Sequence, residues 1–433
     1  MVDVADIASW LAGKIVGSNA TLIDDATELH QLNLIWEQLL PKLSYLFTAD
    51  QKTARLKILQ ENIKFVNMFN NMESKSQLKV TIFSLFSQDE MALYVGGSDV
   101  FPEFEDDTEF DDIDTDLTSN LFQEKYFDWR DFGVVGPIRN QGSCGSCWVF
   151  SAIASIESKM VIEHQVLFQL SPQSVLSCFD SPTQGCKGGN FAKVFKSYST
   201  SHSLLTEGKF KYRQTDSVQC PVQASGVIRT TGMSNIHKIS NDRLVSAVRR
   251  QPVSVAIDAS SKCFQFYSHG ILSQDSCSSV SHRINHAVVI VGFHNVGSTD
   301  KSNPPYWIVR NSWGKHWGAH GYVYIEFDSF LINSQVSYPE HAHFSPECIE
   351  SEQSLFDCKM LGKFVNTSSL HNLHESSGMQ RVVIIGVLFC GWFALVLYSL
   401  LSIVRRRWCP SKEHLDSRIL LDHDYDSLIL NDF

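Results

Sequence analysis

The sequence predicts an α+β domain that follows a small helical domain and precedes one transmembrane helix. Three observations predict this arrangement. Apolar residues recur at helical spacing from Leu32 to Met72 and again after Cys147. Short β-rich runs come later, at Val253–Ile257 and Val288–Phe293. Finally, residues 382–404 are 23 uncharged, mainly apolar residues, which at about 1.5 Å per residue span a hydrocarbon core about 30 Å thick.

Length and charge limit the classes of protein that fit. A chain of 433 residues is too long for one ordinary domain, so several domains or appended segments are expected. The net charge of -11, with no long Lys/Arg run in the part expected to fold, argues against nucleic acid as a partner. Seven of the eleven cysteines lie between Cys144 and Cys277, which indicates an oxidising compartment.

The residues before the α+β domain divide into three segments. Residues 1–30 are an uncertain N-terminal segment in which charged residues interrupt the apolar ones, so no secretory signal is predicted. Residues 31–102 form the helical domain, whose two amphipathic helices are split near Pro41 and the Thr48 cap. Every charge in residues 103–121 is negative, and self-repulsion predicts an extended acidic linker there.

The α+β domain is expected at 122–340, followed by a polar lumenal stalk at 341–381, the transmembrane helix at 382–404 and a tail at 405–433. Three arginines open the tail, whereas only Arg381 borders the other end of the apolar run. The positive-inside rule therefore predicts a cytosolic tail and a lumenal or extracellular α+β domain. Translocation of the N-terminal part then has no visible signal, which favours an incomplete or mispredicted start.

The segment Gln141–Trp148, QGSCGSCW, places two cysteines three positions apart at the start of a helical pattern. A zinc site would need a second Cys/His pair at ligand spacing, and a redox pair would need a thioredoxin-like βαβ context. The sequence has neither, so we expect no metal and no cofactor. A nucleophile at a helix start remains, because helix N-terminal amides favour the thiolate, which is the attacking form of cysteine.

This segment resembles the Cys-Gly-Ser-Cys-Trp signature of the papain family of cysteine proteases, in which a histidine and an asparagine follow far downstream. The sequences INHAVV around His286 and RNSWG around Asn311 are similar to the family's histidine strand and asparagine turn. The resemblance implies a cysteine endopeptidase in which Cys147 is the nucleophile, His286 pairs with its thiolate and later protonates the leaving amine, and Asn311 orients the imidazole. It implies that Gln141 donates to the oxyanion and that Trp313 shields the imidazole's hydrogen bond. It also implies a papain-like two-lobed fold, with a helical left lobe and a β-barrel-like right lobe.

The resemblance further implies which residues bind substrate. Within the loop Gly185–Gly189 the family pairs glycine backbone with extended substrate, since glycine allows two main chains to approach closely. The pocket for the second residue before the scissile bond has apolar walls and a polar floor, which predicts an apolar preference. The residues expected to bind substrate are Gly145, Gly188, Gly189, Asn190, Phe191, Ala256, Ile284, Trp313 and, at the floor of the pocket, Gln335.

Disulfides are also implied by the resemblance. A third family bridge does not carry over, because the usual late partner of Cys277 aligns with Phe330. The sequence leaves a bridge between Cys263 and Cys277 as an alternative. Asn285 stands where the family commonly has Asp, which predicts an altered pH profile. The two bridges that carry over join Cys144 to Cys186 and Cys178 to Cys220.

The helical domain resembles the inhibitory propeptide of cathepsin L-like members. In that family the segment runs backwards through the cleft and blocks it, so we expect a zymogen with its own propeptide as intramolecular inhibitor. Acidification is expected to weaken its docking by protonating carboxylates. No insertion resembles the occluding loop of cathepsin B, which favours endopeptidase over carboxydipeptidase activity. The residues that carry the propeptide resemblance are Arg55, Ile58, Leu59, Asn62, Val66 and Asn70.

The tail contains two segments that resemble endosomal sorting signals. Residues 416–421 resemble an acidic dileucine signal and residues 425–428 a tyrosine-based signal, which predicts recognition by a clathrin adaptor and delivery to a lysosome or endosome membrane. Asn366 begins a glycosylation acceptor triplet in the stalk. The alternative from another class is a catalytically silent relative that serves as a membrane receptor. The signal residues are Asp416, Leu420, Leu421, Tyr425 and Leu428.

Overall fold

The computed structural model describes residues 36–37, 47–96, 125–179, 185–200, 202–221, 226–277 and 283–366. The chain divides into two compact units, Met1–Leu370 and His371–Phe433, and all described residues belong to the first. The N-terminal segment 1–30, the acidic linker, the apolar run 382–404 and the signals of the tail lie outside the described residues. Among the helices that are described, none combines the length and the apolar character needed to cross a bilayer.

Residues 47–96, here called the N-terminal region, fold around one long helix. This helix, α3 (Lys52–Asn70), buries one face because its apolar residues recur at helical spacing. A shorter helix, α4 (Gln88–Val95), starts at Ser87, whose hydroxyl accepts a hydrogen bond from Glu90 N while the Glu90 carboxylate accepts one from Ser87 N. Gly96 ends α4 in a left-handed conformation. The other elements of this region are η1 (Ala49–Gln51), β1 (Ser76–Leu78) and η2 (Ile82–Leu85).

The first half of the α+β domain is largely helical. Its longest helix, α6 (Cys147–His164), is buried around most of its circumference because it packs between the sheet strands β7 and β10 and the helix α8 (Phe191–Thr200). The helix α7 (Pro172–Cys178) begins at the Ser171 cap with proline in its first turn. The remaining elements of this half are β2 (Tyr126–Asp128), η4 (Trp129–Phe132), β3 (Val166–Leu167) and η5 (Gly185–Lys187).

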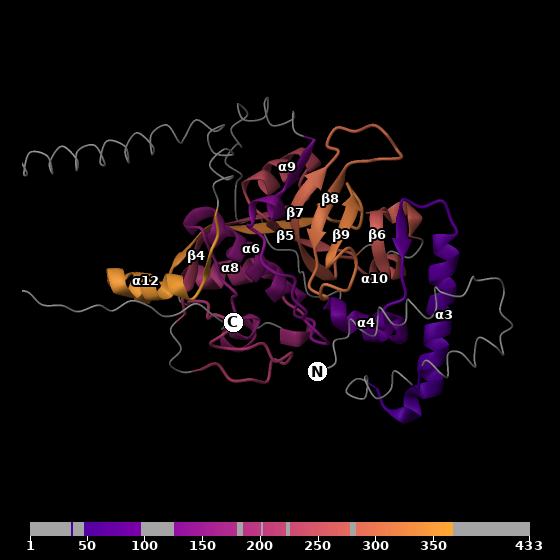
Figure 1. The fold of residues 1–433 in the computed structure, drawn as a ribbon, viewed down its shortest axis with the longest axis horizontal. Helices are drawn as coiled ribbons and strands as arrows, with labels where there is room; N and C mark the ends of the chain where they lie inside the picture. The colour runs from indigo at the N-terminus through magenta and orange to yellow at the C-terminus, as the bar shows by residue number, and fades with distance from the viewer. Residues whose placement is uncertain are drawn as a thin grey trace, which may run out of the picture. The chain divides into compact units, whose positions relative to one another are not determined.

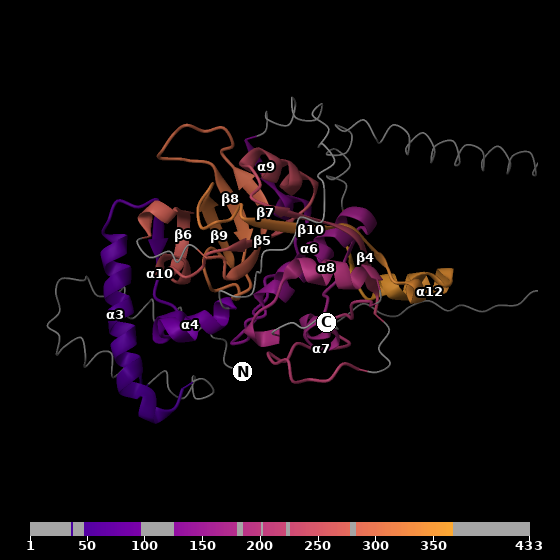
Figure 2. The same cartoon turned by 180° about the vertical axis from the view of Figure 1, so that it is seen from behind.

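The second half supplies most of a nine-stranded sheet in the order β1-β6-β9-β8-β7-β5-β10-β4, with β2 paired to β7. The pairs are antiparallel except β6 with β9, which is parallel. Figures 1 and 2 show α6 and α8 near β4 and β10, whereas α3 stands beside β6. The elements are β4 (Ile228–His237), α9 (Asn241–Arg250), β5 (Val253–Ile257), α10 (Lys262–Gln265), β6 (Tyr267–Leu272), η6 (Gln274–Ser276), β7 (His286–His294), β8 (Tyr306–Arg310), β9 (Tyr322–Glu326) and β10 (Gln335–Phe344).

The N-terminal region extends this sheet by one strand. Ser76 lies opposite Gly270 and Leu78 opposite Tyr267, so that β1 covers the edge that β6 would otherwise expose. Gly270 permits this pairing because it has φ +86° and because a Cβ at this position would lie 2.2 Å from the carbonyl oxygen of Lys75. The strand pairing joins the N-terminal region to the α+β domain through backbone hydrogen bonds.

The folded part continues past residue 340, where the sequence predicted a stalk. The strand β10 pairs with β4 as far as Phe344, and Cys348 is buried in the core with its sulfur bonded to Cys358. Two short helices, α11 (Pro346–Ile349) and α12 (Glu352–Met360), and the strand β11 (Lys363–Phe364) follow, and β11 pairs with β3. The predicted stalk boundary at 341 therefore differs from the structure, because a disulfide and a strand pair fold a segment whose composition is polar. Asn366 is exposed just beyond this segment.

Candidate active site

Cys147 is the first residue of α6, and its side chain is buried. Its sulfur lies near the backbone amides of Ala287, Trp148 and Cys147 itself, and its thiol donates to the carbonyl oxygen of Val95 at 3.8 Å. Burial raises the pKa of the thiol to about 11, although these amide hydrogen bonds oppose the shift. In this state Cys147 is therefore a neutral thiol near pH 7 and not the attacking thiolate.

His286 begins β7 and is fully buried among aromatic rings. Its Nε2 hydrogen-bonds to Asn311 Oδ1 at 2.9 Å, and Trp313 lies over the pair with its ring centroid 5.0 Å from the imidazole. Burial lowers the pKa of His286 to about 4, whereas the Asn311 hydrogen bond raises it. His286 and Asn311, two members of the expected catalytic set, are thus hydrogen-bonded, and Trp313, the residue expected to shield them, packs against the imidazole.

Gln141 connects this set to the start of α6. Its backbone N–H donates to the carbonyl oxygen of Ser312, and its side-chain oxygen accepts a hydrogen bond from Ser312 Oγ at 2.6 Å. Because the oxygen is held this way, the amide Nε2 faces the Cys147 region, where it donates to the carbonyl oxygens of Cys144 at 2.9 Å and Tyr94 at 2.7 Å. A fixed N–H donor beside a buried cysteine is the arrangement that stabilises an oxyanion.

The end of α4 occupies this site. Two backbone carbonyls of the N-terminal region meet the two groups expected to contact substrate, since Tyr94 O accepts from Gln141 and Val95 O from the Cys147 thiol. Gly96 is so close that a Cβ added there would lie 3.5 Å from the sulfur of Cys147. Gly145 makes this approach feasible, because a Cβ there would lie 3.0 Å from Leu93 O and 2.5 Å from Cys186 O. The N-terminal region thus covers the reactive atoms with main chain.

The residues expected to bind substrate fall into two groups. Phe191, Ala256 and Ile284 share one apolar cluster, and Gln335 lies opposite Ala256 in the β10–β5 pairing. Asn190 is buried next to Phe191. Gly188 has φ +123° and a Cβ at Gly189 would lie 2.3 Å from the Trp148 ring, so both positions of the loop require glycine. The structure brings the predicted pocket residues together around the apolar core cluster that contains Phe191, Ala256 and the buried face of α6.

The cysteines separate into bridged and free ones. Cys144 is bonded to Cys186 and Cys178 to Cys220, the two pairs that the resemblance implies. Cys263 and Cys277 are buried free thiols, so the bridge left open by the sequence is not formed here. A hydrogen bond between these two thiols lowers the pKa of Cys263 and raises that of Cys277. Across the described ranges, no group of three or more His, Cys, Asp or Glu side chains is placed to hold a metal ion.

Polar residues of the predicted propeptide pattern hold the N-terminal region together. Arg55 is buried and bonds both carboxylate oxygens of Glu90 and the carbonyl of Leu85, which ties α3 to α4. Asn62 Nδ2 donates to Ser84 O at 3.0 Å, and Lys262 of the α+β domain donates to Asn62 Oδ1 at 2.9 Å. Asn70 exchanges hydrogen bonds with the backbone of Leu78 on β1.

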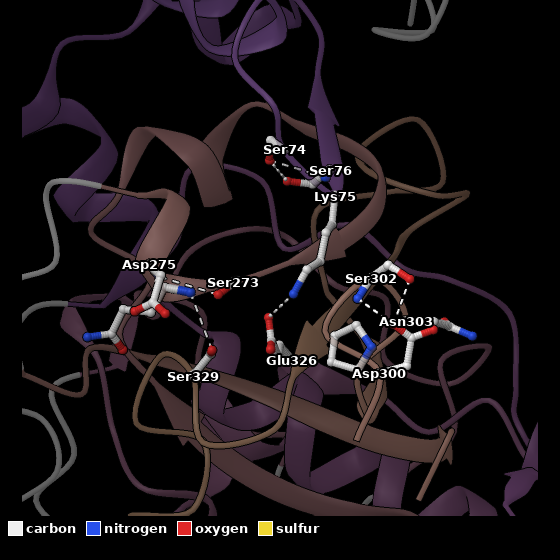
Figure 3. Close-up of polar contacts among 12 residues, drawn as sticks. Ser74, Lys75, Ser76, Ser273, Asp275, Asp300, Ser302, Asn303, Glu326 and Ser329 are labelled. Carbon is white, nitrogen blue, oxygen red and sulfur yellow. Dashed lines mark hydrogen bonds and ion pairs between the residues drawn. The ribbon is translucent and has the colours of Figure 1, made fainter. Parts of the chain in front are cut away.

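A second contact with the α+β domain lies at the sheet edge. Figure 3 shows Lys75 reaching across to Glu326, with Nζ 3.3 Å from the carboxylate oxygen. Residues 73–75, the 273–276 segment and the 298–305 loop surround a cavity of about 590 Å³ there. Its side chains carry both signs of charge and hydroxyls, as Lys75, Asp275 and Ser273 illustrate in Figure 3. This contact is polar and partly exposed, in contrast to the buried contact at Cys147.

Three features were missed by the sequence analysis. Ser312, which fixes the Gln141 amide, directly follows Asn311 in the RNSWG motif, and this adjacency was the available signal. The blocking carbonyls of Tyr94 and Val95 could have been located from the Ser87–Glu90 capping pair and the glycine that ends α4. The Cys348–Cys358 bridge had only the ten-residue spacing of the two cysteines as a signal.

Comparison with known proteins agrees with this geometry. The model of the family described as papain family cysteine protease matches residues 123–340. Vignain from Phaseolus vulgaris is 34% identical over 276 residues, which cover 63% of this chain and 74% of vignain. Procathepsin L from Mus musculus is 31% identical over 306 residues, 68% of this chain and 86% of its own length. A solved digestive procathepsin L2 proteinase from Tenebrio molitor aligns with TM-score 0.62 and 27% identity, and covers 71% of this chain and 99% of that structure.

Proposed function

Because the chain belongs to the papain family of cysteine proteases, we propose that it is an endopeptidase that acts through Cys147, His286, Asn311 and Gln141. The family and the procathepsin relatives make it a cysteine peptidase formed as a proform. The observation that carries the residue assignment is the contact of the Gln141 amide and the Cys147 thiol with two successive backbone carbonyls, Tyr94 O and Val95 O. A bound peptide substrate would likewise present a backbone carbonyl to the Gln141 amide and the Cys147 sulfur.

The proposed reaction begins when the N-terminal region leaves. Water then reaches Cys147 and His286, so the burial that raises the cysteine pKa and lowers the histidine pKa is relieved. The proton passes from the Cys147 thiol to the imidazole, which gives a thiolate–imidazolium pair. The thiolate attacks the scissile carbonyl carbon, and the oxyanion that forms accepts hydrogen bonds from Gln141 Nε2 and the N–H of Cys147.

His286 completes both halves of the cycle. Its imidazolium protonates the leaving amine as the C–N bond breaks, and a thioester between Cys147 and the substrate acyl group remains. The neutral imidazole then takes a proton from water as the water attacks the thioester carbonyl. The C–S bond breaks, the carboxylic acid product leaves, and the thiolate–imidazolium pair is restored. Asn311 Oδ1 holds the ring through Nε2, at the 2.9 Å contact described above, which leaves Nδ1 for these transfers.

Specificity is proposed to rest on the apolar cluster behind α6. Phe191, Ala256 and Ile284 supply apolar walls, and Gln335 adds a polar group beside Ala256. We expect aliphatic or aromatic residues to be preferred two positions before the scissile bond, with tolerance for polar ones. A peptide library profiled on the processed enzyme measures this, and equal turnover of all side chains at that position would contradict it.

We propose a location in the endolysosomal membrane, with the peptidase in the lumen. The apolar run 382–404 followed by three arginines, and the two sorting signals of the tail, support it. Three disulfides within the described part fit an oxidising lumen. The test is a reporter that carries residues 371–433. It should reach lysosomes, and the Leu421→Ala/Tyr425→Ala double variant should stay at the cell surface. Equal distribution of the two would refute the sorting role.

The catalytic assignment is tested by covalent labelling of the processed full chain with an epoxide inhibitor of cysteine proteases. We expect one inhibitor per chain on Cys147 and complete loss of labelling and peptidase activity in Cys147→Ser. Cys263→Ser is the matched control, because Cys263 is also a buried free thiol, and it should label like the unmodified chain. Undiminished activity in Cys147→Ser would show that Cys147 is not the nucleophile. Absence of activity and labelling in the unmodified processed chain would favour the silent receptor.

A further inference from the structure

A small cavity lies behind the catalytic set, between α6 and the strands β7 and β8. Its volume is about 20 Å³, and a cavity of roughly 10–15 Å³ or more holds one water molecule when polar groups surround it. Charged and amide side chains line it alongside apolar ones from α6 and β7. The polar residues of the lining are Arg139, Ser151, Glu157, Arg310, Asn311 and Ser312.

Three polar atoms of these residues have no hydrogen-bond partner within the described part of the chain: Glu157 Oε2, Arg310 Nη1 and Asn311 Nδ2. The residues that carry them are 1%, 5% and 3% exposed, so bulk water does not solvate them. A buried polar group without a partner costs about 1–3 kcal/mol, which makes three such atoms around one cavity unfavourable unless something in it bonds them.

The remaining atoms of the same side chains are already fixed. Glu157 Oε1 accepts from Arg139 Nη2 at 2.6 Å and from Leu170 N at 2.7 Å. Arg310 Nη2 donates to Pro137 O at 2.6 Å. Asn311 Oδ1 faces two donors, His286 Nε2 and Ser312 N, so its amide cannot be reversed without losing both bonds. The three unpartnered atoms are therefore held in the orientations seen here.

The hydrogen-bonding properties of these three atoms determine which molecule or ion can occupy the cavity. Arg310 and Asn311 present N–H donors, so the occupant must accept two hydrogen bonds; Glu157 presents a carboxylate oxygen, so it must also donate one. Chloride would satisfy the donors but would face the Glu157 oxygen as a second anion. A metal cation would satisfy Glu157 but would face the Arg310 guanidinium. One water molecule has two lone pairs and two protons and satisfies all three atoms.

We propose that this cavity binds one internal water molecule that accepts hydrogen bonds from Arg310 Nη1 and Asn311 Nδ2 and donates one to Glu157 Oε2. Glu157 is then a positioning residue: through the water it holds the Asn311 amide, whose oxygen holds His286. This role rests on the proposed function, in which Asn311 orients the imidazole. The water site itself does not, because it depends only on the geometry of α6, β7 and β8.

The direct test is crystallographic and needs no activity. Crystals of the full-length Cys147→Ala chain, grown with bromide in place of chloride, should show a water peak within hydrogen-bonding distance of all three atoms and no anomalous bromide signal. An anomalous peak, an empty cavity, or a direct contact that closes Glu157 onto Asn311 would each overturn the proposal.

Glu157→Gln tests the positioning role. The new amide must keep its oxygen toward Arg139 and Leu170 N, so its NH2 would face the cavity and present a third donor to a water with two lone pairs. We expect the water peak to disappear and kcat/KM of the processed enzyme to fall about tenfold, the size of one lost hydrogen bond. The basic limb of the pH profile should move to lower pH, because the Asn311 bond raises the pKa of His286.

The matched control is Glu163→Gln, the same change on the same helix. Glu163 also bonds a cation and a backbone amide, Lys159 and Ala342 N, but it does not line the cavity. This variant should leave the pH profile unchanged even if it costs stability. Equal pH profiles for Glu157→Gln and the unmodified enzyme, with the water still present, would refute the positioning role. An unmodified enzyme without any activity would instead refute the proposed function and leave the crystallographic result standing.

Discussion

Two of the contacts between the N-terminal region and the α+β domain use different chemistry. At Cys147 the N-terminal region presents backbone carbonyls and a glycine to buried groups. At the edge of β6 it presents a paired strand and the exposed Lys75–Glu326 ion pair. The first contact uses main-chain atoms that every residue carries, whereas the second combines a backbone strand pairing with a partly exposed ion pair of side chains. This difference indicates that covering the active site and attaching the N-terminal region depend on separate contacts. We expect pH and salt to act mainly on the attachment.

The largest expected difference concerns the reactivity of Cys147. With a pKa of about 11, roughly one thiol in 10,000 is ionised at pH 7 in the intact chain. Removal of residues 47–96 exposes the sulfur and permits the ion pair with His286. We expect alkylation by iodoacetamide at pH 7 to become faster on the order of 1,000-fold, measured by mass spectrometry of the peptide that carries Cys147. Rates within a factor of three of each other would show that the carbonyl contact does not suppress the thiolate.

The next effect separates catalysis from inhibition at one residue. Gln141→Ala removes the donor that Tyr94 O meets in the intact chain and the oxyanion meets in the reaction. We expect kcat of the processed enzyme to fall about 100- to 1,000-fold. The stability of the intact chain should fall by about 3 kcal/mol, because three buried side-chain hydrogen bonds are lost. Gln173→Ala, which removes a buried glutamine bonded to Thr215 O away from the site, should change stability without changing kcat. Comparable kcat values for the two variants would count against an oxyanion role.

A smaller effect should come from the Arg55–Glu90 pair, which ties α4 to α3. The Arg55 hydrogen bond lowers the pKa of Glu90 from its ordinary value of 4.5. Because the folded pKa is depressed, the stabilisation is present above about pH 4.5 and is lost as the pH falls through the folded pKa. Glu90 is one-third exposed, so we expect Glu90→Gln to cost about 1 kcal/mol at pH 7.

Thermal unfolding of the full-length Cys147→Ala chain, with and without Glu90→Gln, measures this loss between pH 3 and 7. The two curves should converge as the pH falls through the lowered pKa of Glu90 in the folded chain. Glu61→Gln, a change at an exposed carboxylate on α3, should leave the curve unchanged. Parallel curves for the Glu90 variant and its parent at every pH would show that this pair does not contribute to acid release.

The smallest effect is expected at the sheet edge. Lys75→Met breaks the ion pair with Glu326, in which both side chains are partly exposed. We expect a loss of no more than about 0.5 kcal/mol, which disappears in 1 M salt because exposed pairs are screened. Chemical denaturation at low and high salt checks this, with Lys57→Met on the exposed face of α3 as the control. A loss above 2 kcal/mol that persists in high salt would mean that the second contact, too, depends on a buried interaction.

Much of the site could be predicted because its signals are local. The QGSCGSCW segment places Cys147 at a helix start, and the INHAVV and RNSWG segments each carry one partner beside recognisable neighbours. The structure brings His286 into contact with Asn311 and Trp313, bonds Gln141 to Ser312 beside them, and contains the two disulfides that the resemblance implies. The family match ends at residue 340, where the sequence placed the end of the peptidase domain. The order of the residues that follow was not expected, because β10 beyond Pro339 and the Cys348–Cys358 loop are polar and owe their order to pairing with β4 and to the bridge.

The sequence by itself predicted the candidate site residues Cys147, His286, Asn311 and Gln141, a helix that begins at Cys147, and a helical segment that resembles a propeptide before the peptidase. These are properties of residue type and short spacing, which the chain carries wherever it folds. Only the tertiary structure decided that Tyr94 and Val95 supply the blocking carbonyls, that Cys263 and Cys277 stay as thiols, and that Glu157, Arg310 and Asn311 face one cavity. These depend on distances between residues tens to hundreds of positions apart, which packing sets and which local pattern does not encode.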